Sequence, residues 1–332
     1  MNKKIMTGSL SLIALAMSLV GCSSTTSSDT ATSSEEAKTS TKADFDTTKA
    51  IKFYTRDTTS GTRDGFFTKI GMGSAKSDDS KLGAGFITVN SNGDMVNSIK
   101  NDEYGIGYIS LSSLESSTLI GLKYDGVNPS EANVLNNTYQ LTRNFNYVTR
   151  NDYAADSKVK QIVEAFTAYM GTTEGKAIIK ANDGIISLSA SDKSWNDIKN
   201  TYPIINEDNK NITVYFGGST SCEKIAKALT SAFSPLCGNF IANHNHTGSG
   251  DAFKHTQATA TKDDATGKLD VGFLSRELES NEPAAEGTFG KICTDAIVAV
   301  VNSKNTYRET DAETLKAIYQ GTKKTWNQVI VA

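Results

Sequence analysis

One local pattern occurs three times in the chain and constrains the fold more than any other feature. In each copy a short apolar run, β-branched or aromatic and typical of a strand, leads into a loop rich in glycine, serine and threonine. A segment with apolar residues at helical spacing follows each loop. Alternating strands and helices predict an α/β fold with largely parallel sheets covered on both faces. The loops are residues 56–64, 217–221 and 247–250.

These loops have the chemistry of an oxyanion site. A helix start leaves backbone N–H groups without partners and carries the positive end of the helix dipole. Glycine lets the backbone approach a ligand, and serine and threonine hydroxyls can donate to its oxygens. A single loop of this kind is as often only a helix cap as part of a binding site. Three in one chain, one of them with Arg56 and Arg63, favour a cage of donors beyond the carboxyl ends of the strands.

The first residues predict export. Lys3 and Lys4 precede an apolar stretch at residues 9–20, which is the layout of a secretory signal and is too short to span a bilayer. The signal peptide is expected to be residues 1–21. The run that ends in Gly21 and Cys22 resembles a bacterial lipobox, which implies that Cys22 is acylated. An ordinary signal peptide with a cysteine nearby by chance is the alternative.

The segment after Cys22 predicts a tether, and the charge of the chain restricts the class of partner. Residues 22–48 are rich in Ser, Thr and Ala and predict a flexible tether between the lipid and the folded body. The formal net charge of −3 argues against nucleic acid as a partner. It does not argue against an anionic ligand, because backbone amides and helix ends bind anions without net positive charge.

Cysteines and histidines give no firm metal signal. Cys222, Cys237 and Cys293 remain beyond the anchor, an odd number that allows one disulfide at most. His244, His246 and His255 all fall near the third loop. An H-x-H pair on a strand end could suit zinc or nickel, but no Asp, Glu or Cys completes a set by spacing. No metal is expected; a pH-sensitive surface or simple hydrogen bonding is the other interpretation.

Segments of nearly all of residues 51–332 carry a family resemblance, among them RDTTSGTRDGF, YGIGYISL, YQLTRNF, ITVYFGGSTS, HTGSG, DVGFLSRE and DAIVAVVN. With these segments the sequence resembles the phosphate-binding proteins of high-affinity phosphate ABC transporters, the PstS family. The resemblance implies a two-lobed periplasmic-binding-protein fold of type II, with mixed, mainly parallel sheets flanked by helices. It also implies a monomeric lipoprotein on the outer face of the cytoplasmic membrane, which delivers phosphate to the permease subunits of an ABC importer and uses no cofactor.

The order of the segments is rotated relative to the common family arrangement, in which the GSTS-like segment comes before the SGTRD-like one. Here SGTRD comes first, which predicts a circular permutation; a chain truncated from a tandem duplication is the alternative. Two crossover strands are expected near residues 141–149 and 296–302. One lobe would then comprise residues 49–142 plus 302–332, with the SGTRD loop, and the other residues 143–301, with the GSTS and GSG loops.

The resemblance also implies which residues bind the ligand. Arg56 is expected to make a charge-assisted contact, and the other loop residues to donate hydroxyl or amide hydrogens. Arg63 either contacts the ligand or pairs at the helix start. The predicted ligand-binding residues are Arg56, Ser60, Gly61, Thr62, Arg63, Thr220, Ser221, Ser249 and Arg276.

Two departures from the family pattern bear on the identity of the oxyanion. Thr58 stands where members often carry an aspartate that orients the arginine, and Asp57 is a candidate substitute. Arg276 stands where some members carry the aspartate that accepts the ligand's proton and rejects sulfate, with Asp64 and Glu277 as candidate acceptors. Sulfate, molybdate and arsenate therefore stay open as alternative ligands.

Two further function classes, an enzyme and a surface protein for adhesion or sensing, are possible for a chain with these features. An enzyme would need Ser249 or Ser60 as its nucleophile, yet neither lies in G-x-S-x-G and no His/Asp partner is suggested by the sequence. A serine that cradles an anion needs no base, so no catalytic activity is expected. A surface protein that uses the same scaffold for adhesion or sensing is compatible with the long tether.

Overall fold

The structure is a computed structural model, and it describes residues 45–258 and 267–330. The predicted signal peptide, the predicted acylation site Cys22 and most of the predicted tether lie outside the described residues. Among the described helices, none is both long and apolar enough to cross a membrane.

The folded body begins earlier than the sequence predicts. Phe45, which falls in the predicted tether, is buried, and its ring packs against those of Tyr104 and Trp326. The backbone next to it is bonded to the other end of the body, since Asn327 N donates to Thr47 O at 2.7 Å. The two ends of the body are thus hydrogen-bonded neighbours, as a circular permutation requires.

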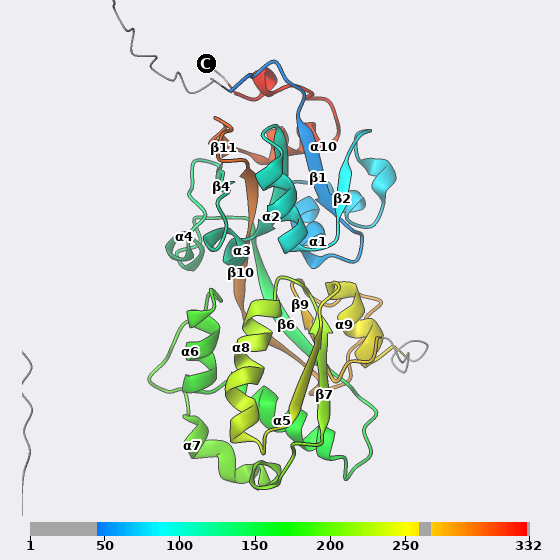
Figure 1. The fold of residues 1–332 in the computed structure, drawn as a ribbon, viewed down its shortest axis with the longest axis vertical. Helices are drawn as coiled ribbons and strands as arrows, with labels where there is room; N and C mark the ends of the chain where they lie inside the picture. Colours follow the sequence, from blue (N-terminus) through cyan, green and yellow to red (C-terminus); the bar gives the residue numbers. More distant parts are fainter. Residues whose placement is uncertain (1–44, 259–266, 331–332) are drawn as a thin grey trace, which may run out of the picture. The chain divides into compact units, whose positions relative to one another are not determined.

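Strands and helices alternate along most of the chain (Figure 1). The strands are β1 (Lys52–Arg56), β2 (Ile87–Val89), β3 (Gly105–Ser110), β4 (Ile120–Gly121), β5 (Lys123–Tyr124), β6 (Thr142–Thr149), β7 (Thr213–Gly218), β8 (Ile241–Asn245), β9 (Val271–Leu274), β10 (Phe289–Val301) and β11 (Glu309–Thr310). The α-helices are α1 (Gly61–Lys69), α2 (Asn92–Asn101), α3 (Leu111–Glu115), α4 (Glu131–Leu135), α5 (Lys158–Met170), α6 (Thr173–Ala181), α7 (Trp195–Ile198), α8 (Glu223–Phe233), α9 (Ser249–Thr256) and α10 (Ala312–Tyr319). Short 3₁₀ turns are η1 (Gly73–Lys76), η2 (Asp79–Lys81), η3 (Lys199–Thr201), η4 (Pro203–Asn206), η5 (Ser234–Leu236) and η6 (Trp326–Gln328).

Two groups of parallel strands are joined through two long antiparallel ones. β1 pairs in parallel with β2 and β3, and β7 pairs in parallel with β8 and β9. Between the groups, β10 is antiparallel to β3 and β6, and β6 is antiparallel to β9. The hydrogen-bonded path therefore runs β2-β1-β3-β10-β6-β9-β7-β8, with β4 beside β10. The predicted α/β class is confirmed.

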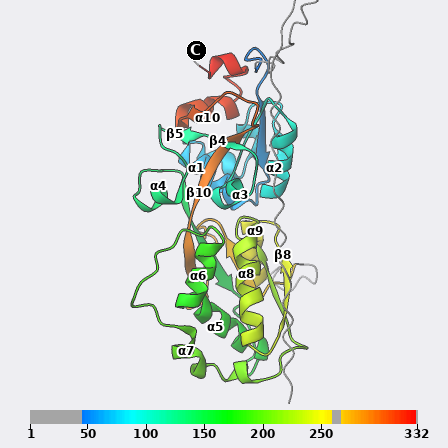
Figure 2. The same cartoon turned by 60° about the vertical axis from the view of Figure 1, so that its left-hand side comes forward.

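Each group of parallel strands has its own hydrophobic core. In the first core, Phe66 of α1 stacks on Tyr108 of β3 with ring centroids 4.1 Å apart, and Tyr319 of α10 packs edge-on against Phe66. In the second core, Phe166 of α5 packs edge-on against Phe216 of β7. Helices α5 and α8 cover this second group of strands (Figure 2). Two cores on one continuous sheet are the packing expected of a two-lobed binding-protein fold.

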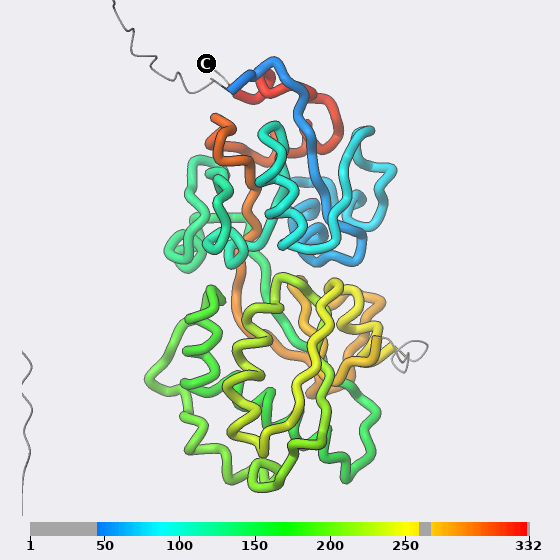
Figure 3. Tube along the Cα trace, viewed as in Figure 1, coloured from blue at the N-terminus to red at the C-terminus, as the bar shows by residue number. Residues whose placement is uncertain are grey.

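Strands β6 and β10 pass from one core to the other (Figure 3). Before β6, Leu141 belongs to the first core, whereas Phe145 within the strand belongs to the second. Along β10, Cys293 belongs to the second core and Ala296 to the first. The sequence-based division put residues 296–301 with the GSTS loop, whereas these side chains pack in the first core, because β10 bonds to β3 there.

Candidate oxyanion-binding site

The start of α1 is built to sit against other loops. Ser60 caps the helix by accepting from Arg63 N at 3.3 Å, and Ser60, Gly61 and Thr62 are all buried. A Cβ on Gly61 would collide with the hydroxyl of Ser249 and come within 2.6 Å of the Ser275 hydroxyl. Only glycine therefore lets the backbone at this helix start approach the GSG loop.

The GSTS loop is held in a similar way. Gly218 ends β7 with φ at +95°, a conformation that favours glycine, and a side chain there would meet the backbone of Phe273. The turn brings Ser219 N to Phe273 O at 2.7 Å, so the loop is fixed to β9 before α8 begins. The sequence therefore needs glycine here to turn the chain across the end of the strand.

Arg56 lies at the end of β1 and is almost completely buried. Its Nη2 donates to Asn90 O at 2.8 Å and to the Thr220 hydroxyl at 3.4 Å, which joins β1 to the GSTS loop. Asp57 Oδ2 lies 3.6 Å from the same nitrogen, so Asp57 supplies the neighbouring carboxylate that Thr58 cannot. Burial lowers the pKa of Arg56, and the charge of Asp57 opposes that effect. The guanidinium remains charged, because arginine is not deprotonated in proteins.

The Ser221 hydroxyl is the point where three segments meet. It accepts from Asn92 Nδ2 at 2.9 Å and from Arg143 Nη2 at 3.0 Å, and it lies 2.9 Å from the Thr62 hydroxyl. Sequence reasoning singled out Thr62 and Ser221 but missed Asn92 and Arg143. Arg143 stands in the YQLTRNF segment that carries part of the family resemblance, which is the signal that could have found it.

A second group of hydroxyls faces Gly61. Ser219 Oγ donates to Ser275 Oγ at 2.8 Å, and Ser249 Oγ lies 3.2 Å from the same atom. All three serines are buried. Ser219 and Ser275 were not predicted, although each directly precedes a predicted residue. We use the name polar cage for Arg56, Thr62, Asn92, Arg143, Ser219, Thr220, Ser221, Ser249 and Ser275 together.

Arg63 points away from this cage. Its Nε and Nη2 donate to Ala75 O at 3.1 and 2.6 Å, and Nη2 also pairs with Asp79 at 2.7 Å. Its Nη1 donates to Arg56 O at 2.8 Å. Of the two roles expected for Arg63, the structure therefore favours pairing at the helix start, where it ties α1 to the η1–η2 segment.

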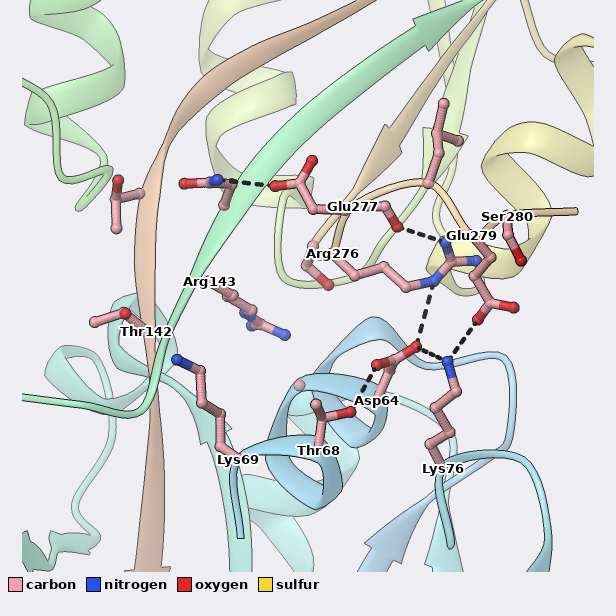
Figure 4. A pocket seen from close by; sticks show the side chains of 15 residues that line it. Asp64, Thr68, Lys69, Lys76, Thr142, Arg143, Arg276, Glu277, Glu279 and Ser280 are labelled. Atoms are coloured by element: carbon pink, nitrogen blue, oxygen red, sulfur yellow. Dashed lines mark hydrogen bonds and ion pairs between the residues drawn. The ribbon is translucent and has the colours of Figure 1, made fainter. Parts of the chain in front are cut away.

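The guanidinium of Arg276 is engaged by a carboxylate. It pairs with Glu282 through contacts of 2.6 and 2.9 Å. The side chain lines an open cleft of about 540 Å³ (Figure 4). The carboxylate that holds this guanidinium, Glu282, was not considered in the sequence analysis. Arg276 lines this cleft together with Arg143 and Ser275, so its role as a ligand contact stays a prediction.

The two candidate proton acceptors line the same cleft. Asp64 pairs with Lys76 at 3.2 Å, and Glu277 accepts from Asn144 Nδ2 at 2.8 Å (Figure 4). Both carboxylates are therefore engaged by neighbours on the open side of the site. Their contacts are with Thr68, Lys76, Arg276 and Asn144 rather than with the hydroxyls of the polar cage.

Two of the histidines form a hydrogen-bonded chain that reaches the GSTS loop. His246 Nδ1 lies 3.1 Å from Ser219 O, His246 Nε2 lies 3.1 Å from His244 Nδ1, and His244 Nε2 lies 2.9 Å from the Thr230 hydroxyl. Burial lowers the pKa of His244 to about 4. Within residues 45–258 and 267–330, no three His, Cys, Asp or Glu side chains are grouped to hold a metal ion.

The cysteines are buried thiols. Cys222, Cys237 and Cys293 are all unpaired and buried in the second core. Burial raises the pKa of Cys222 and Cys237 to about 12, which keeps both as thiols near neutral pH. Their position among apolar side chains gives them a packing role.

Known proteins resemble the chain over most of its length. A family model described as a PBP superfamily domain matches residues 206–332. The phosphate-binding protein PstS 2 of Streptococcus agalactiae is 27% identical over 315 residues, which cover 94% of this chain and 92% of that protein. PstS 2 of Streptococcus pneumoniae is 26% identical over 283 residues, which cover 84% and 87% of the two chains.

A solved structure shares the fold. It is a phosphate-binding protein of a phosphate ABC transporter from S. pneumoniae TIGR4, with a TM-score of 0.58 and 24% identity; the match covers 85% of this chain and 100% of that one. Because one alignment spans 94% of this chain and 92% of the S. agalactiae relative, both carry their segments in the same order. The circular permutation itself stays a prediction from the order of the segments. The resemblance found in the sequence is confirmed.

Proposed function

We propose that this chain, which belongs to the PstS family of phosphate-binding proteins, captures inorganic phosphate outside the cytoplasm and delivers it to an ABC importer. The proposal makes the polar cage the ligand site. In it, Arg56 supplies the charged contact, Thr62, Thr220, Ser221 and Ser249 supply hydroxyls, and the start of α1 supplies backbone amides. Arg63 supports the site from outside it, and Arg276 stays a predicted ligand contact.

One observation carries this proposal: all three predicted loops converge. The Thr62 hydroxyl lies 2.9 Å from that of Ser221, and Gly250 N donates to Thr59 O at 3.0 Å. Arg56 reaches Thr220 as well. Helix starts that converge with hydroxyls and a buried arginine form a site for a small oxyanion, because donors then approach it from several directions.

The names of the relatives support phosphate as the ligand. Both streptococcal proteins are called phosphate-binding, and the solved structure is described as part of a phosphate ABC transporter. We further propose acylation at Cys22, which would keep the protein at the outer face of the membrane beside the permease subunits. The tether would give the body reach toward the permease.

The test is a calorimetric titration of the soluble body, from Phe45 onward, with phosphate, arsenate, sulfate and molybdate. We expect tight one-to-one binding of phosphate, with sulfate and molybdate much weaker. A chain that binds none of the four overturns the oxyanion site altogether.

A second candidate ligand has its own support. Arg276 stands where some family members have an acidic acceptor, and both Asp64 and Glu277 are engaged by other side chains. A site without an acceptor for a proton on the ligand would also bind an oxyanion that has no proton, such as sulfate. Tighter binding of sulfate or molybdate than of phosphate in the same titration would favour this candidate.

A further inference from the structure

Arg143 and Asp295 form a buried ion pair at the passage between the two cores. They are direct cross-strand partners in the β6–β10 ladder, and both side chains are nearly inaccessible. Phe145 on one strand belongs to the second core and Ala296 on the other to the first. The pair therefore lies on both strands that join the lobes.

The pair leaves hydrogen-bonding capacity unused. Arg143 donates from Nε at 2.9 Å and from Nη2 at 2.8 Å, both to Asp295 Oδ2. Arg143 Nη1 and Asp295 Oδ1 are buried without a hydrogen-bond partner, as is Arg56 Nε. Arg63, by contrast, uses all three of its nitrogens on the backbone and on Asp79. Buried donors without partners are uncommon in proteins and call for a specific role.

Arg143 also reaches the ligand loops directly. Its Nη2 donates to the Ser221 hydroxyl at 3.0 Å, so the guanidinium spans from Asp295 to the GSTS loop. Arg143 is close enough to Arg56 for its charge to lower the pKa of Arg56. Two positive side chains in one buried region repel each other, and an anion between them would relieve that repulsion.

We propose that Arg143 is a second arginine that binds the oxyanion, and that Asp295 is the positioning residue that aims it. The inference rests on the proposed function and adds a contact from the strands between the lobes to those from the loops. Ligand binding would then involve both lobes and the passage between them. Asp295 acts through Arg143 and need not touch the ligand.

The effect of Asp295 on phosphate affinity, through Arg143, can be distinguished from its effect on folding stability. Its single Oδ2 accepts both Arg143 donors, so an asparagine can keep that acceptor while it loses the charge. An alanine keeps neither. If Asp295 works by aiming Arg143, Asp295→Asn should retain more phosphate affinity than Asp295→Ala, and removal of Arg143 should make residue 295 irrelevant to affinity.

The experiment is a double-mutant cycle on the soluble body, with phosphate affinity measured by calorimetry and folding checked by circular dichroism. Arg143→Ala should weaken binding at least about tenfold, because a charge-assisted contact is lost. Arg143→Lys keeps the charge but has one donor group, and it should weaken binding about threefold or more. Arg143→Ala with Asp295→Ala should bind no more weakly than Arg143→Ala alone.

Asp270→Asn is the matched control. Asp270 is also buried, and burial raises its pKa. It precedes β9, whereas Ser275 follows that strand, and it accepts hydrogen bonds from Tyr215 N and the Tyr153 hydroxyl. This variant should bind phosphate as the wild type does. Unchanged affinity in both Arg143 variants, or additive losses in the cycle, would overturn the inference. A wild type that binds no phosphate would instead overturn the proposed function.

Discussion

The hydroxyls of Thr62 and Ser221 lie 2.9 Å apart, and this contact joins the start of α1 to the GSTS loop. The two residues are far apart in the sequence and pack beside different cores. Their contact depends on the lobes being together, so the same atoms that would bind an oxyanion also hold the two loops against each other.

Replacing Ser221 should therefore affect both binding and stability. Ser221→Ala removes the acceptor of Asn92 and Arg143, so two buried donors lose a partner. We expect phosphate affinity to fall at least about tenfold and the free energy of unfolding to fall by about 1–3 kcal/mol. Calorimetry and urea denaturation measure the two effects. Ser234→Ala, which removes one bond to Phe240 O, is the control and should leave affinity unchanged.

Gly61 tests how closely the loops approach. Gly61→Ala puts a methyl group against the hydroxyls of Ser249 and Ser275, so the helix start must move away from the GSG loop. We expect a loss of about 1–3 kcal/mol in stability and at least about tenfold weaker phosphate binding. Gly93→Ala in the first turn of α2 is the control, because the nearest atom to its added carbon is 3.6 Å away. Equal affinities of the two variants would contradict the close approach.

The convergence of the loops could be predicted, because it follows from local pattern. A strand, a glycine-rich loop and a helix start appear together in the sequence, and parallel strands bring such loops to one edge of a sheet. The loops that contain Thr62, Ser221 and Ser249 were identified in this way, and the family resemblance singled out these residues within them. Asn92 was not, since it opens α2 without a glycine-rich loop before it, and its contact with Ser221 depends on how the lobes pack.

The roles of the arginines could not be read from the sequence. Arg56 and Arg63 lie in one loop, yet the first turn of α1 rotates Arg63 toward Ala75 while Arg56 faces Thr220. That rotation depends on where the η1–η2 segment packs. The YQLTRNF segment marks Arg143 only through the family resemblance, and its role depends on contacts with Ser221 and Asp295, which lie far away in the sequence.

The two arginines of the first loop should separate affinity from stability. Arg56→Ala should weaken phosphate binding at least about tenfold, because it removes the charged contact proposed for the ligand. Arg63→Ala should cost about 1–3 kcal/mol of stability for each of the two buried acceptors that lose a hydrogen bond, Ala75 O and Arg56 O. The folded fraction should bind phosphate within about threefold of wild type. Calorimetry on the folded fraction, with thermal melts beside it, distinguishes the two. The reverse pattern would assign the ligand contact to Arg63.

The histidine chain predicts how stability depends on pH. Burial depresses the pKa of His244 from 6.5 to about 4, so the folded state favours the neutral ring. Below pH 6.5 the unfolded chain takes up a proton that the folded chain does not, and stability from this group is lost as the pH falls toward 4. His244→Gln lacks the titrating group and keeps polar atoms near Thr230 and His246. The wild type should therefore lose about 1–2 kcal/mol more than the variant between pH 7 and 4, a figure reduced because the ring is only partly buried. Urea denaturation at several pH values gives the free energy of unfolding of both proteins. Carboxylates that titrate in both contribute equally, so their effect drops out of the difference. Parallel pH profiles would mean that His244 has the same pKa in the folded and the unfolded protein, which would contradict the depressed pKa.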